Sequence, residues 1–154
     1  MALQATGYSG TPLPRKLGLK DGQAVAFVAL DPALADLADS AAFAEVVRTD
    51  DPGQLASRTY DVVHAFVRRE AEVASGLPAL KDAIKVDGSL WLSWPKKAAA
   101  KAQGIATDVD EHVIRRHALQ GGLVDVKVCA VDDVWSGLKL VIPLAARAAA
   151  KDLQ

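Results

Sequence analysis

The sequence lacks several features that would each indicate a class of protein. It contains one cysteine, Cys129, so no disulfide can form within the chain, and a reducing cytoplasm is the expected compartment. Met1 is not followed by the basic and apolar segments of an export signal. The longest apolar run, residues 24–30, is far shorter than the roughly 20 residues of a membrane-spanning helix. The formal net charge of -1 gives no overall attraction to nucleic acid or membranes. A soluble cytoplasmic protein is expected.

Metal-ligand sets and catalytic motifs are also missing. His112 and His117 turn to different faces of a helix, and with a single cysteine in the chain we expect no metal site. His64 lies inside an apolar strand pattern, so we favour a hydrogen-bonded core histidine over a general base that has no marked partner. Cys129 has apolar neighbours and is expected to be an inert buried thiol. The basic pair at residues 115–116 has no interleaved aromatic residues, so it does not indicate nucleic-acid binding.

What the sequence does contain is a regular alternation of strand and helix patterns. Hydrophobic residues make up 51% of the 154 residues, enough for one core. We therefore expect a single Rossmann-like domain over residues 1–154, with residues 1–22 as an ordered lead-in and residues 144–154 as a C-terminal tail.

Six segments have the composition of strands. Residues 23–30 form a continuous apolar run, which favours a central parallel strand buried on both sides. The last two segments flank the turn-like residues 132–137 and predict an antiparallel hairpin. The six segments are residues 23–30, 44–48, 60–67, 89–94, 123–131 and 138–142. Together they predict a three-layer α/β sandwich with a mainly parallel sheet in the strand order 2-1-3-4-6-5.

Four helical segments connect these strands. Asp31 and Pro32 have the types preferred at a helix start, and we expect a helix over the alanine-rich residues that follow. Apolar residues at spacings of three and four predict a helix over residues 69–85, kinked or split near Pro78. Residues 95–106 are expected to form a loop or a frayed helix. Asp108 and Glu111 have the spacing of a capping box and predict the next helix start.

The predicted strand order places a crevice at the carboxyl ends of the first and third strands, where open α/β sheets bind ligands. A group of positive and aromatic side chains follows the third and fourth strands: Arg68, Arg69, Ser93, Trp94, Lys96 and Lys97. This basic rim could bind a small anionic ligand, with Trp94 as a stacking wall. Alternatively, the charges are a solvated rim and Trp94 covers the core.

Trp135 falls in the turn-like segment of the hairpin. A large apolar ring in a turn needs a partner, so it either folds back over the sheet edge or forms a subunit contact in a homo-oligomer. Both alternatives remain open from the sequence.

Three blocks of the sequence resemble a family of small uncharacterised bacterial proteins, domain of unknown function 3052. They are YSGTPLPRKLGLKDG, LWLSWPKK and GLVDVKVCAVDDVWSGLKLVI. This resemblance implies no catalytic residue and no cofactor. The order of elements is also similar to a trimmed class I methyltransferase, which is a similarity of layout.

The chain departs from the methyltransferase pattern in the turn after the first strand. The sequence ALDPAL contains no glycine, whereas close approach of a cofactor to the backbone there requires one. Asp31 is placed to fill the helix N-terminus with its own carboxylate. Asp50 and Asp51 follow the second strand and indicate either ribose recognition or a plain turn.

The leading hypothesis is a non-enzymatic or degenerate Rossmann-like module that binds a small anionic ligand or a protein partner. The alternatives are a small methyltransferase-like enzyme with an unorthodox cofactor loop, or a structural homo-oligomer. The sequence does not indicate which cofactor, if any, is bound.

Overall fold

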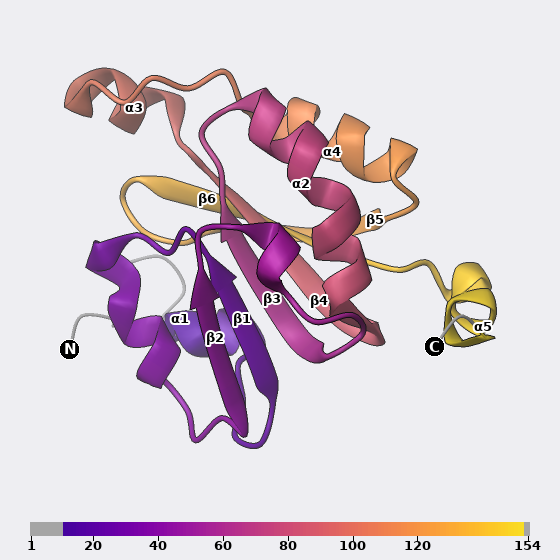
Figure 1. The fold of residues 1–154 in the computed structure, drawn as a ribbon. Helices are drawn as coiled ribbons and strands as arrows, with labels where there is room; N and C mark the ends of the chain where they lie inside the picture. Colours follow the sequence, from indigo (N-terminus) through magenta and orange to yellow (C-terminus); the bar gives the residue numbers. More distant parts are fainter. Residues whose placement is uncertain (1–10, 153–154) are drawn as a thin grey trace.

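A six-stranded sheet forms the centre of the fold. The structure, a computed structural model, describes residues 11–152, and its sheet has the order β2-β1-β3-β4-β6-β5 (Figure 1). The strands are β1 (Ala24–Val28), β2 (Glu45–Thr49), β3 (Tyr60–Phe66), β4 (Ile84–Pro95), β5 (Val124–Ala130) and β6 (Trp135–Val141). β2, β1, β3 and β4 are parallel, whereas β6 is antiparallel to both of its neighbours. The predicted order and directions are confirmed. Residues 1–10 of the predicted lead-in (residues 1–22) and residues 153–154 of the predicted tail (residues 144–154) lie outside the described residues.

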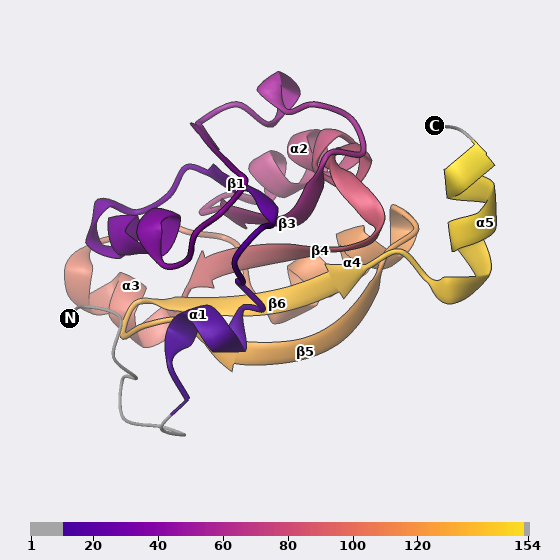
Figure 2. The ribbon, with the colours of Figure 1, turned by 90° about the horizontal axis from the view of Figure 1, so that it is seen from below.

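Helices cover both faces of this sheet. The helices of the described chain are α1 (Leu13–Lys16), the 3-10 helices η1 (Pro32–Asp39) and η2 (Pro52–Gln54), α2 (Glu70–Ala83), α3 (Lys97–Gln103), α4 (Glu111–Gln120) and α5 (Leu144–Asp152). In Figure 1, α2 and α4 lie in front of the sheet, and α1 lies behind it. Figures 1 and 2 show α5 beside the sheet and not over either of its faces, and this helix contacts β4. The predicted three-layer α/β sandwich is therefore confirmed.

Two apolar clusters hold the layers together. On the α2 and α4 side, residues such as Leu80 and Ile114 pack on alternate sheet residues, including Trp94. On the opposite side, the cluster of α1 and η1 includes Trp91 and Trp135. Alternate strand residues point to opposite faces, and Trp91 and Trp94 are three apart, so they must face different layers. The Trp91 indole N–H also donates to the carbonyl of Leu17, 3.1 Å away, which ties the end of α1 to the sheet.

Two predicted helices differ in detail from the structure. Asp31 does cap the helix after β1, since its Oδ1 accepts from the backbone N–H of Ala33, but this helix is a short 3-10 helix interrupted at Leu34. The predicted kinked or split helix is one continuous element, α2, with Pro78 inside it. Proline removes one N–H and would leave the carbonyl of Ala74 without its helical partner. Because Ala74 is exposed, water can satisfy that carbonyl.

The capping prediction at Asp108 is wrong. Asp110 is the N-cap of α4, and its Oδ1 accepts from the N–H of Val113 at 2.9 Å. Asp108 instead accepts from the backbone N–H of Glu70 at 2.6 Å, at the first residue of α2. Asp108 therefore caps a helix 38 residues earlier in the chain and ties the α3–α4 connection to the carboxyl edge of the sheet.

Candidate functional site at the carboxyl edge of the sheet

A hollow of about 470 Å³ lies where β1 and β3 end, between α2 and η2. We call it the edge cavity. Its lining residues are Val28, Ala29, Asp50, Asp51, Pro52, Gly53, Ala65, Phe66, Val67, Glu72, Ser75, Gly76 and Ala79. β2 lies on one side of β1 and β3 on the other, so the cavity occupies the switch point at which open α/β sheets bind ligands.

The three acidic side chains of the edge cavity differ in whether they already accept hydrogen bonds. Asp51 caps η2, with its Oδ1 accepting from the N–H of Gly53 at 2.9 Å. Glu72 accepts from the N–H groups of both Arg68 and Arg69 at the start of α2. Asp50 is exposed, and its carboxylate makes no hydrogen bond or ion pair with other residues between 11 and 152. It also lines a second hollow of about 240 Å³ on the other side of the β2 end. Asp50 is thus the acid of this edge that is available to a ligand.

The turn after β1 adopts a conformation that usually requires glycine. Ala29 has φ 56°, in the left-handed region, and its N–H donates to the carbonyl of Thr49 at 2.9 Å. A left-handed alanine costs roughly 1–2 kcal/mol. The sequence shows that this turn contains no glycine. It does not show that the backbone at Ala29 is nevertheless left-handed. Strain of this kind persists where the surrounding structure enforces it, and it is common at ligand sites.

Asp31 joins this turn to β6, which is three strands away from β1 in the sheet. Its Oδ1 accepts from Ala33 at 3.0 Å, and its Oδ2 accepts from the indole N–H of Trp135 at 2.8 Å. The N-terminus of η1 is therefore filled by a carboxylate, as expected from the sequence. An anion approaching this helix end would meet like charge.

Trp135 is the first residue of β6 rather than part of a turn, and it is 0% exposed. Its ring meets that of Phe66 edge-on at 5.0 Å between centroids, and the guanidinium of Arg68 lies 5.2 Å from the ring centroid. Of the two alternatives, the ring folds back onto the sheet edge. Because the ring is buried, it offers no surface for the predicted contact with another subunit.

The basic rim does not come together as one pocket. Trp94 is 7% exposed and packs in the cluster under α2 and α4, so it covers the core instead of forming a stacking wall. Ser93 is fully buried. The Nζ of Lys96 donates to the carbonyl of Asp132 at 2.7 Å. The exposed cations of the rim are Arg68, Arg69 and Lys97. An anion site at these three residues stays a prediction.

His64 and Ser93 form a buried pair that the sequence did not connect. The His64 Nε2 lies 2.7 Å from the Ser93 Oγ, and the imidazole stacks on Phe66 with 4.4 Å between centroids. Burial lowers the pKa of His64 to about 3, because the charged form would lose its hydration. The pair has the atoms of a base and a nucleophile, but both residues are buried, so its role is to link β3 to β4.

The remaining histidines and the cysteine have different surroundings. His117 Nε2 lies 2.8 Å from a carboxylate oxygen of Glu70, and His112 is exposed. Burial raises the pKa of the Cys129 thiol, which disfavours the reactive thiolate. Among residues 11–152, no group of three or more His, Cys, Asp or Glu side chains could hold a metal ion. No helix in the described part of the chain has the length and apolar character needed to cross a membrane.

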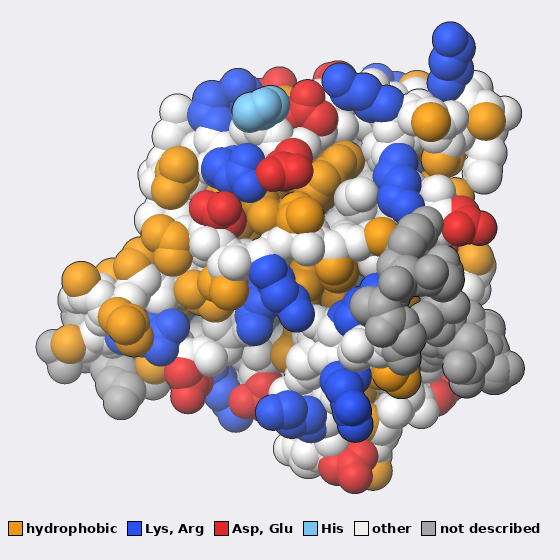
Figure 3. Space-filling view, turned by 180° about the vertical axis from the view of Figure 1, so that it is seen from behind, with side chains coloured by type: hydrophobic (Ala, Val, Ile, Leu, Met, Phe, Trp, Pro, Cys, Tyr) orange, Lys and Arg blue, Asp and Glu red, His pale blue; other side chains and the backbone are white. Residues whose placement is uncertain are grey.

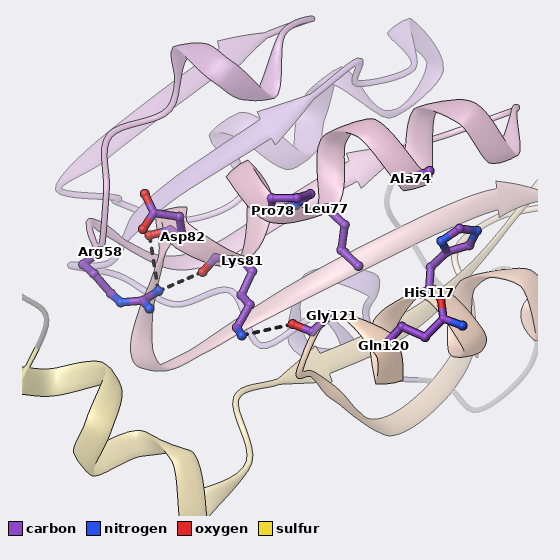
Figure 4. Close-up of a pocket in the computed structure, with 9 residues that line it drawn as sticks. All are labelled: Arg58, Ala74, Leu77, Pro78, Lys81, Asp82, His117, Gln120 and Gly121. Carbon is purple, nitrogen blue, oxygen red and sulfur yellow. Dashed lines mark hydrogen bonds between the residues drawn. The ribbon is translucent and has the colours of Figure 1, made fainter.

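A further hollow of about 490 Å³ lies between α2 and α4 (Figure 4). Its floor is apolar, with Leu77 and Pro78, but its cations serve the backbone. Arg58 donates to the carbonyls of Lys81 and Asp82, where α2 ends, and Lys81 donates to the carbonyl of Gly121. We therefore place the candidate site at the edge cavity, where Asp50 is uncommitted.

The fold is that of known methyltransferases. The magnesium protoporphyrin IX methyltransferase of Synechocystis PCC 6803 with bound SAH has a TM-score of 0.57 and 17% identity, over 80% of this chain and 75% of that one. A second match is a chain in the Haloferax volcanii complex of the Trm112 activator and a putative methyltransferase. Its TM-score is 0.63 and its sequence identity 11%, over 85% of this chain and 86% of that one. A SAM dependent methyltransferase from Aquifex aeolicus has a TM-score of 0.58 and 16% identity, over 84% of this chain and 87% of that one.

The sequence matches no family model and no curated protein, so the likeness to domain of unknown function 3052 rests on the three sequence blocks alone. Identities of 11–17% are informative about architecture only. The chain has the fold of the SAM-dependent methyltransferases.

Proposed function

We propose that this chain is a methyltransferase-like protein whose adenosyl cofactor binds in the edge cavity. The position of the cavity carries the proposal, because it lies at the switch point of the sheet beside the acidic end of β2. Solved proteins with this fold hold SAM or SAH. SAM would supply an activated methyl group for transfer to an acceptor.

The adenosine half of the cofactor fits the residues present. Val28, Ala65 and Val67 offer an apolar surface for a purine, and the volume of about 470 Å³ lies within the usual range of ligand sites, about 300–1,000 Å³. Asp50 is positioned to accept hydrogen bonds from ribose hydroxyls, the role that an acid after the second strand has in dinucleotide-binding folds. The three acids of the lining favour a positively charged sulfonium.

The amino-acid end of the cofactor needs a different partner. The described lining contains no lysine or arginine, and Asp31 already fills the N-terminus of η1. Arg68 directly follows the lining residue Val67, is exposed and has no ion pair within residues 11–152; its guanidinium lies 5.2 Å from the Trp135 ring centroid and would have to turn from there toward the cavity. We assign it to the carboxylate of the cofactor, because a guanidinium binds a carboxylate through paired hydrogen bonds.

Isothermal titration calorimetry with SAM and SAH tests the proposal. Asp50→Asn should weaken binding at least tenfold, since a hydrogen bond to a charged group contributes about 1.5–3 kcal/mol and each tenfold is about 1.4 kcal/mol. Asp36→Asn, at an exposed aspartate of η1 outside the cavity, is the matched control and should bind like the wild type. Absence of saturable binding of either compound to the wild type would refute the proposal.

A second candidate is a binding module that uses this fold without catalysis. The engagement of Asp31 by both Ala33 and Trp135 favours it, because it fixes the turn that a cofactor would otherwise approach. Such a module would keep the predicted small anionic ligand or protein partner at Arg68, Arg69 and Lys97. The Haloferax structure, a complex with an activator, supports a search for a protein partner. Conversion of SAM to SAH with any acceptor separates the two candidates.

A further inference from the structure

Two lysines face each other directly across the hairpin. Lys127 of β5 and Lys139 of β6 are register partners, and Lys139 is in turn the partner of Trp91 in β4. The three side chains thus form a row on the α1 side of the sheet, where Trp91 meets Leu17. Like charges directly opposite each other on neighbouring strands are destabilising. The row therefore keeps an unfavourable pair of charges in place.

Neither lysine of the row is neutralised within the described chain. The Nζ of Lys127 lies 5.9 Å from the centroid of the Trp91 ring, a cation–π distance that holds it over the sheet next to Lys139. Residues 11–152 supply no ion pair for Lys20, Lys127 or Lys139. Desolvation lowers the pKa of Lys139, and the positive charges of Lys127 and Lys20 lower it further. Lys20 is thus the third cation of this group.

A polar hollow of about 240 Å³ adjoins the group. It is lined by Lys20 and Lys139, with the Ser89 hydroxyl as a neutral donor, and by two acids, Asp61 and Asp87. Asp61 is committed, because it accepts from the N–H of Ala24 at 2.9 Å and pairs with Lys85 at 3.2 Å. Asp87 remains as one negative charge against three lysines. Figure 3 shows this side of the molecule, where Lys and Arg side chains lie across the middle and lower part and also along the top, with acidic side chains among them.

We propose that Lys20, Lys127 and Lys139 form a binding site for a phosphate group on the α1 side of the sheet. An ammonium group is a compact point charge that binds phosphate well. Lys20 and Lys139 line the hollow, and Lys127 lies directly opposite Lys139 on β5, so the three lysines match a multiply charged oxyanion. A bound phosphate would also relieve the repulsion between Lys127 and Lys139. The site lies near the amino ends of β3 and β4, at the opposite end of these strands from the edge cavity, and does not depend on the proposed function.

Calorimetric titration with inorganic pyrophosphate, at constant ionic strength set with sodium chloride, tests this site. We expect saturable binding to the wild type and at least a tenfold loss of affinity in Lys139→Met, which keeps the apolar length of the side chain. Lys127→Gln, on the edge strand, should give a similar loss and serves as a second variant if Lys139→Met does not fold. Lys101→Met, at an exposed lysine of α3, is the control and should bind within twofold of the wild type.

Three results would overturn the proposal. The first is no saturable binding of pyrophosphate to the wild type. The second is unchanged affinity in both Lys139→Met and Lys127→Gln, which would place the anion elsewhere, for example at Arg68, Arg69 and Lys97. The third is equal affinity for citrate, which would mean that the site selects charge and not phosphate. SAM binding should be the same in all these variants, so failure here is distinguishable from failure of the proposed function.

Discussion

The bond between Asp31 and Trp135 connects residues 104 positions apart, and breaking it should have a measurable cost. Asp31→Ala removes an N-cap, which costs about 1 kcal/mol. It also leaves the buried indole N–H of Trp135 without an acceptor, which costs about 1–3 kcal/mol. The expected loss is therefore about 2–4 kcal/mol in the free energy of unfolding. At about 2–4 °C per kcal/mol for a chain of this size, the midpoint of thermal unfolding should fall by about 4–16 °C.

A double-mutant cycle isolates the bond from the cap. Urea unfolding of Asp31→Ala, Trp135→Phe and the double variant should give a coupling energy of about 1.5–3 kcal/mol, because Phe lacks the indole donor. Asp51→Ala is the control, since Asp51 caps η2 and its carboxylate accepts from the N–H of Gly53 without an indole partner. It should cost only about 1 kcal/mol. A coupling energy below about 0.5 kcal/mol would refute the argument that this bond fixes the turn after β1.

Two further predictions concern the sheet. The unfolded chain takes up a proton on histidine near pH 6.5, whereas folded His64, with a pKa of about 3, does not. Stability should therefore fall by up to about 1.4 kcal/mol for each pH unit below 6.5, and His64→Gln should flatten this slope in urea titrations between pH 6.5 and 5; an unchanged slope would contradict the burial argument. Gly88→Ala should destabilise the chain by about 1–3 kcal/mol, because its Cβ would lie 2.9 Å from the carbonyl oxygen of Tyr60 and 3.0 Å from that of Asp61. Gly53→Ala, whose Cβ would meet only the side chain of Asp51, should cost less in the same thermal unfolding assay.

The strand order could be predicted because it depends on properties that sequence displays directly. Residues 24–30 are apolar without interruption, a composition that favours a strand covered on both sides. The capping prediction at Asp108 failed for a physical reason. Asp108 and Asp110 are both near the start of α4, and only the packing of α4 against α2 decides which carboxylate meets which free N–H group.

The candidate site, too, could be predicted from the sequence only in part. The carboxyl edge follows from the strand order, and the sequence places the acids Asp50 and Asp51 directly after the second strand. Trp94 does not form the expected stacking wall, since side chains that follow adjacent strands need not point to the same place. Trp94 turns to the α2 side, and Ser93 turns inward to His64. The left-handed conformation of Ala29 has no residue-type signal, because alanine rarely adopts it.

The irregular backbone of the edge strand β5 affects the tendency of the protein to aggregate in a concentrated solution. As the last strand of the order, β5 leaves one row of backbone groups unpaired, and Val126 and Val128 are 53% and 49% exposed. Such an edge would recruit another strand if it were straight. The register shift between Asp125 and Lys127 interrupts the ladder at Val126, and a lysine follows immediately. An incoming strand would find no continuous run of partners, so this edge protects the protein against strand-mediated aggregation.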